Sequence, residues 1–108
     1  MSARILQVNF RFNVPRSEFE QMASSVAPDF ARLPGLRWKI WLMNEEEEEA
    51  GGIYVFEDEA SLKAYLDGPL ASSVMSNPAL SNLSVKVFDS LDEISAVTRG
   101  PVEIGESV

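Results

Sequence analysis

The chain of 108 residues contains no cysteine and no histidine. The absence of cysteine excludes a disulfide scaffold, a thiolate nucleophile and any sulfur-ligated metal. The absence of histidine removes the commonest general base and the commonest metal ligand together. Few enzymes work without both residue types, so the chemistry of this protein must be narrow or absent.

Positive charge is also scarce, because nine Lys and Arg residues face 17 Asp and Glu residues and give a net charge of −8. Nucleic-acid phosphates would be repelled over most of such a surface, so we expect no nucleic-acid partner. No apolar run approaches the roughly 20 residues that span a membrane. The first residues lack the continuous apolar stretch of a signal peptide. We therefore expect no membrane partner and a cytoplasmic location.

What remains is the composition of an ordinary globular domain, 45% hydrophobic and 24% charged. A chain of this length has room for a single domain, and no internal repeat or linker divides it. We predict one domain over residues 1–99, followed by a loose tail over residues 100–108.

Four segments alternate between apolar and polar residues and are predicted to be strands, over residues 4–12, 36–43, 53–56 and 83–89. The five consecutive glutamates at residues 45–49 cannot pack and are predicted to form a solvated loop. The second and third strands are close in sequence, so they are expected to form a hairpin around this loop.

A first helix is predicted from apolar residues at helical spacing. Ser17 and Glu20 have the form of a capping box at its start. Pro28 is expected to end this helix or to kink it near Ala27, because proline lacks the N–H that a helix requires.

A second helix is predicted to begin after Asp58, which is a good N-cap residue. Gly68 is placed just beyond its end, and Pro69 is suited to start a further short helical segment that reaches Met75. Residues 92–97 are expected to form a last short turn of helix.

The order strand, helix, two strands, helix, strand predicts an α+β fold of the ferredoxin-like βαββαβ type. It has a four-stranded antiparallel sheet with its helices on one face. Both faces of the sheet carry large apolar groups: Leu36 and Trp38 are placed on one face of the second strand, and Trp41 and Met43 on the other. Helices cover only one face, and an exposed apolar patch of this size would be unusual. We therefore predict a homodimer.

Several segments of the chain resemble the YdhR family of putative mono-oxygenases. They are the Trp-Lys-x-Trp run within residues 34–41, the Gly-Gly-x-Tyr-x-Phe run within 49–56, the opening strand at 6–10 and the closing strand at 85–89. The resemblance implies a dimeric α+β barrel, in which two ferredoxin-like sheets face each other. It also implies a link to cofactor-independent monooxygenases that oxidise polycyclic aromatic compounds, so no cofactor is expected.

Three residues are predicted to be catalytic: Asn9, Arg11 and Tyr54. Asn9 and Arg11 share one face of the first strand, where an amide and a guanidinium could stabilise a developing oxyanion. The hydroxyl of Tyr54 could move a proton. The alternative for Arg11 is an ordinary surface ion pair.

Trp38, Tyr65 and Phe10 are predicted to bind the substrate, because aromatic side chains suit a flat aromatic ligand. The alternative is that these residues fill the core and the dimer interface. Trp38 and Trp41 lie on opposite faces of their strand, so at most one of them is expected in any single pocket.

Other polar features receive structural interpretations. Lys39 and Lys86 lie inside strands, where a desolvated lysine could act as a base or Schiff-base nucleophile. They are instead expected to lean outward or to pair with a carboxylate. No metal site is expected, because the consecutive glutamates converge poorly on one ion. Gly51 and Gly52 are expected to permit a bulge or a close backbone approach.

The leading functional hypothesis is a cofactor-independent monooxygenase that acts on a small aromatic or quinone-like compound. One alternative is a non-catalytic dimer that binds a small apolar ligand. Another is an isomerase or a decarboxylase-like enzyme on the same barrel.

Overall fold

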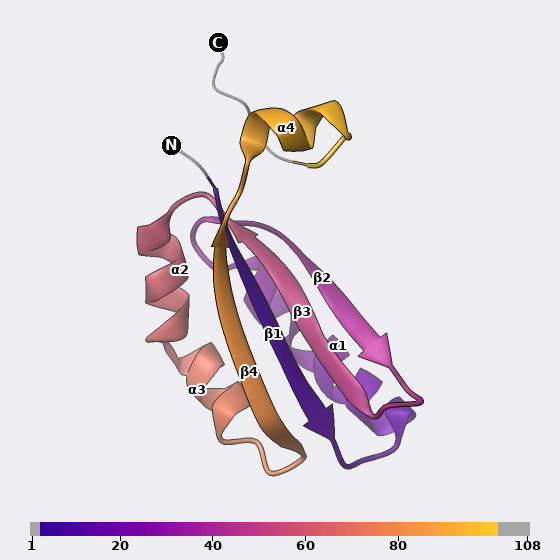
Figure 1. The fold of residues 1–108 in the computed structure, drawn as a ribbon. Helices are drawn as coiled ribbons and strands as arrows, with labels where there is room; N and C mark the ends of the chain where they lie inside the picture. Colours follow the sequence, from indigo (N-terminus) through magenta and orange to yellow (C-terminus); the bar gives the residue numbers. More distant parts are fainter. Residues whose placement is uncertain (1–2, 102–108) are drawn as a thin grey trace.

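A computed structural model of the chain describes residues 3–101 and contains a four-stranded antiparallel sheet (Figure 1). Its strands are β1 (Arg4–Phe12), β2 (Leu36–Asn44), β3 (Glu49–Phe56) and β4 (Leu80–Asp89). Their order across the sheet is β2-β3-β1-β4, which is the predicted ferredoxin-like arrangement. β3 and β4 begin four and three residues earlier than predicted, because pairing with β1 continues to Glu49 in β3 and to Leu80 in β4.

The helices are α1 (Arg16–Ala31), α2 (Glu59–Leu66), α3 (Pro69–Met75) and α4 (Asp92–Val97). α1 lies behind β2 and β3 in Figure 1, whereas α2 and α3 follow the β4 side of the sheet. α4 stands beyond the end of the sheet. None of the helices in the described part of the chain is long and apolar enough to cross a membrane.

The core forms where the helices meet one face of the sheet. From β1 it takes every second residue, Leu6, Val8, Phe10 and Phe12, and the helices contribute residues such as Phe30 and Leu62. This alternation is the predicted one. The opposite face of β1 carries Ile5, Gln7, Asn9 and Arg11, and no helix of the βαββα unit covers it.

The capping box expected at the start of α1 is not formed. The helix begins at Arg16, one residue after Pro15, and no side chain caps it, so Ser17 does not form a capping box. Instead, the Pro15 carbonyl accepts the first backbone N–H groups. Pro28 does not end the helix, which continues to Ala31. Phe30, in the last turn, is buried in the core, and such packing contributes more to helix stability than local propensity does.

The second helix follows the prediction at both ends. The Asp58 carboxylate accepts a hydrogen bond of 2.8 Å from the Ser61 backbone N–H, and this bond lowers the pKa of Asp58. α2 ends at Leu66, and Pro69 occupies the first turn of α3.

A register shift in β2 corrects the predicted faces of that strand. Leu36 pairs with Phe56, and Trp38, two residues later in β2, pairs with Val55, which is only one residue away from Phe56 in β3. Leu36 therefore packs against the core, and grouping it with Trp38 on one face was wrong. The extra residue, Arg37, is accommodated at this irregularity.

Candidate functional site

A cavity of about 250 Å³ lies between the sheet and helices α1 and α3. It is lined by Phe10, Phe19, Met22, Ala23, Ser25, Val26, Phe30, Lys39, Trp41, Gly51, Tyr54, Ser73, Val74, Asn77 and Leu80. Most of these side chains are apolar or aromatic. An apolar cavity of roughly 150 Å³ admits benzene, so this one has room for a small aromatic compound.

Lys39 brings a charged group into this apolar cavity. Its Nζ lies 3.5 Å from the ring centroid of Phe30, 3.4 Å from that of Trp41 and 4.5 Å from that of Tyr54. Among the described residues, no carboxylate forms an ion pair with Lys39. The amine is therefore held by the faces of aromatic rings, which attract cations.

The environment of Lys39 shifts its proton affinity. Burial lowers its pKa from the ordinary value of 10.5 to about 7, because the charged form loses solvation. The three ring faces favour the ammonium and act in the opposite direction. Lys39 thus exchanges its proton much closer to neutral pH than an exposed lysine does.

Tyr54 places a hydroxyl on the same side of the sheet. It shares a buried hydrogen bond of 3.2 Å with the hydroxyl of Tyr65 on α2. Burial raises the pKa of Tyr54 and of Tyr65, since a phenolate would lose its hydration. Both hydroxyls therefore stay protonated at neutral pH and can act as hydrogen-bond donors.

The sheet divides the six predicted site residues into two groups. Phe10 and Tyr54 line the cavity, and Tyr65 contacts Tyr54 from α2. The other three lie on the opposite face.

On that opposite face, Asn9 Oδ1 accepts a hydrogen bond of 2.9 Å from Gln7 Nε2. Arg11 forms an exposed ion pair of 3.6 Å with Glu48, the surface pair considered from the sequence. Trp38 Nε1 donates a 3.0 Å hydrogen bond to the Pro101 carbonyl. Within one chain, these three residues do not reach the cavity.

The sequence interpretation of Lys39 was wrong, because its side chain points into the cavity and not outward. The alternation of residues along β2 could have indicated the true orientation of Lys39. Lys39 shares a face of the strand with Trp41 and Met43, and all three lie on the side of the helices. Lys86 on β4 is exposed, as expected.

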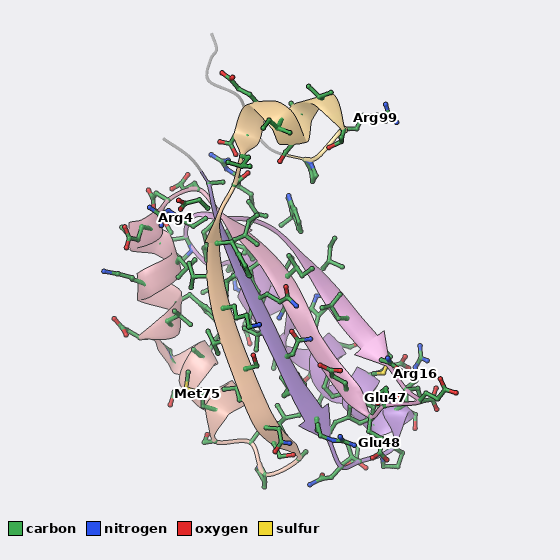
Figure 2. The ribbon with its side chains drawn as sticks, viewed as in Figure 1. Arg4, Arg16, Glu47, Glu48, Met75 and Arg99 are labelled. Atoms are coloured by element: carbon green, nitrogen blue, oxygen red, sulfur yellow. The ribbon has the colours of Figure 1, made fainter. Side chains whose placement is uncertain are left out.

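Residues 45–48 form an exposed turn, as predicted, whereas Glu49 already belongs to β3. Figure 2 shows Arg16 at the same end of the molecule as Glu47 and Glu48, and Arg16 Nη1 lies 3.1 Å from a carboxylate oxygen of Glu45. Within residues 3–101, no group of three acidic residues is arranged to hold a metal ion.

The two adjacent glycines of β3 approach different neighbours. A Cβ on Gly51 would lie 1.9 Å from the backbone oxygen of Val8. A Cβ on Gly52 would lie 2.9 Å from Lys39 Cε and 3.3 Å from Tyr54 Cε1. The prediction of a close backbone approach is therefore confirmed at Gly51, whereas Gly52 leaves room for the Lys39 side chain.

The fold and the cavity together define a ferredoxin-like α+β protein with an apolar pocket between sheet and helices. The chain belongs to the family described as "Putative mono-oxygenase ydhR", which it matches over residues 5–101. No curated protein sequence matches it.

Solved structures share the fold at low sequence identity. A protein of unknown function from Nitrosomonas europaea, NE2512, has a TM-score of 0.72 and 22% identity, covering 84% of this chain and 91% of its own. SnoaB, a cofactor-independent oxygenase from Streptomyces nogalater, has a TM-score of 0.69 and 22% identity, covering 83% and 94%. The heme-degrader MhuD from Mycobacterium tuberculosis has a TM-score of 0.61 and 19% identity, covering 81% and 95%.

Proposed function

We propose that this protein is a cofactor-independent monooxygenase that acts on a small aromatic or quinone-like compound bound in the cavity. The observation that carries the proposal is the cavity itself, which is apolar, faced by aromatic rings and supplied with Lys39 and Tyr54 as its ionisable groups. Membership of a mono-oxygenase family and the fold shared with SnoaB support the reaction type.

The proposed reaction needs little from the protein. The substrate is deprotonated to an electron-rich anion, and this anion reduces O2 directly. The substrate supplies all four electrons, so one oxygen atom forms a new bond to a substrate carbon and the other leaves as water. The protein must therefore hold a flat ring, remove a proton and stabilise the resulting charge. Phe10 supplies ring contact, and Tyr54, oriented by Tyr65, can donate a hydrogen bond to a substrate oxygen. Catalytic roles for Asn9 and Arg11, with Trp38 binding the substrate, would require a ligand on the opposite face.

Filling the cavity should abolish this activity. We expect Ala23→Phe to reduce oxygen uptake with hydroquinones and anthrone-like phenols by at least about tenfold, because the new ring occupies the substrate's space. Ser24→Phe is the matched control, because Ser24 is exposed on the same helix and does not line the cavity. Uptake would be measured with metal-stripped protein and no added flavin. Equal uptake by the two variants would place the reaction elsewhere.

A non-catalytic ligand-binding protein is the second candidate, favoured by the predominantly apolar lining of the cavity. The same pair of variants separates the two functions. Ligand binding that is lost in Ala23→Phe, with no oxygen uptake by the wild type across the panel, would support the binding protein.

We further propose that the sheet face opposite the helices meets a second copy of the chain. Ile40 on β2 and Phe88 on β4 belong to this face and are 51% and 46% exposed. Exposed apolar side chains on two strands of an uncovered face are typical of an interface.

Accordingly, Ile40→Lys should weaken the dimer by about tenfold or more, since a charge would be buried at the interface. Sedimentation or light scattering across a dilution series would measure this effect. Met75→Lys serves as the control, because Met75 is 55% exposed but lies on α3, on the helix side (Figure 2). A wild-type monomer at micromolar concentration would contradict the proposal.

A further inference from the structure

Within residues 3–101, no polar side chain is placed to match the charge of Lys39 in the cavity. Its nearest neighbours are the ring faces of Phe30, Trp41 and Tyr54, and among the described residues no carboxylate pairs with it. An ammonium in such surroundings gains only part of the stabilisation that water or a hydrogen-bond acceptor would give. A ligand with an acidic or anionic oxygen would supply the missing partner.

The elements around the cavity offer no competing titratable group except one. The lining residues of α1 are apolar except for Ser25, and those of α3 and the following loop are Ser73, Val74 and Asn77. On the sheet, Tyr54 is the one titratable lining residue besides Lys39, and burial with Tyr65 keeps its hydroxyl protonated. Lys39 is therefore the group in the cavity that can accept a proton at neutral pH.

We propose that Lys39 takes the hydroxyl proton of a phenol or enol bound in the cavity and then pairs with the resulting oxide. This inference rests on the proposed function and names its substrate class, an aromatic compound with an acidic hydroxyl group. The proton moves from the ligand oxygen to the lone pair of Nζ and leaves an aryl oxide beside an ammonium. No bond to carbon changes and no oxidant is consumed in this step.

Three features of the cavity suit this step. The missing side chain of Gly52 leaves space for the Lys39 stem, so the amine can rest against the rings. Proton transfer creates a pair of opposite charges in an apolar site, where their attraction is stronger than in water. An amine with a pKa near neutrality is also well matched to a general base.

The inference can be tested with para-nitrophenol, whose anion absorbs at a longer wavelength than its neutral form. We expect wild-type protein to bind the compound as its anion at a pH where the free compound is mostly neutral. Lys39→Met should bind it at least about tenfold more weakly and in the neutral form. Lys63→Met, which removes an exposed lysine on α2, should behave as the wild type.

Lys39→Arg separates the two roles of the lysine. Arginine keeps the positive charge but does not give up its proton, so it cannot act as a base. We expect this variant to bind the preformed anion at high pH. The pH dependence of kcat/KM for a hydroquinone should then shift towards the pKa of the substrate itself.

The outcomes distinguish this inference from the proposed reaction. Binding of neutral nitrophenol by the wild type, an unchanged spectrum in Lys39→Met, or no binding at all would overturn the role of Lys39. A Lys39-dependent anion spectrum without oxygen uptake from any hydroquinone would support proton transfer while contradicting the oxygenase.

Discussion

Lys39→Met should stabilise the protein by about 2 to 4 kcal/mol at pH 7, measured as the free energy of unfolding in urea. Methionine has a similar length, carries no charge and packs favourably against aromatic rings. The charged form of the wild-type lysine is disfavoured in the folded state, because burial removes its hydration, and its pKa falls to about 7 for the same reason. A residue that reduces stability at a candidate ligand site is typical of the trade-off between stability and activity.

The same cause predicts a pH dependence. Between pH 7 and pH 10 the unfolded chain keeps the Lys39 proton, whereas the folded protein has lost it. Since the unfolded state binds more protons, the free energy of unfolding should rise with pH across this window. Lys39→Met should lack this rise, so its advantage should be largest at or below pH 7 and disappear near pH 10.

The composition leaves few other groups that could cause a change of stability in this pH range. With no histidine and no cysteine in the chain, few groups titrate between pH 7 and pH 9. Lys63→Met, on the exposed side of α2, is the control, and we expect its stability to stay within about 0.5 kcal/mol of the wild type. If Lys39→Met is no more stable than the wild type, or retains the rise with pH, Lys39 is not desolvated in the folded protein.

Gly51→Ala should be the most destabilising small substitution in the sheet, with an expected loss of at least about 3 kcal/mol. The added Cβ would lie 1.9 Å from the Val8 backbone oxygen, which belongs to the neighbouring strand β1. Neither backbone can move without disturbing the pairing of the two central strands. Thermal and urea denaturation would measure the loss.

Gly52→Ala provides the matched comparison at the next residue. Its Cβ would meet the end of the flexible Lys39 side chain at 2.9 Å, and Lys39 can move. We expect a loss of about 1 kcal/mol or less, accompanied by a displaced amine and weaker phenol binding. Similar losses from the two substitutions would show that the strands, and not the side chains, absorb the strain.

The fold could be predicted from the sequence because its signals are local. The alternation in β1, the Asp58 cap and the Pro69 helix start each specify one element, and the βαββαβ order then restricts the topology. The errors fall where tertiary contacts outweigh local preference. Pro28 remains within α1, whose last turn is anchored in the core by Phe30.

The candidate site was harder to predict, because it depends on which face of the sheet the helices cover. The alternation of residues along β2 places Lys39 on the same face as Trp41. Both faces of β2 carry apolar residues, so the alternation does not show which face the helices cover. A strand lysine is ordinarily outward-facing, and only the three-dimensional structure shows its contacts with three rings. Asn9 and Arg11 share a face with each other but not with Tyr54.

The two tryptophans lie on opposite faces of β2, and this separation gives the protein two independent fluorescent reporters. The Trp41 indole is in the cavity next to the Lys39 amine, so its emission should respond to a bound ring and to the protonation of that amine. Trp38 lies on the other face, where its emission should respond to the proposed pairing of two chains. In Trp38→Phe, the remaining indole signal would report the occupancy of the cavity without any added label.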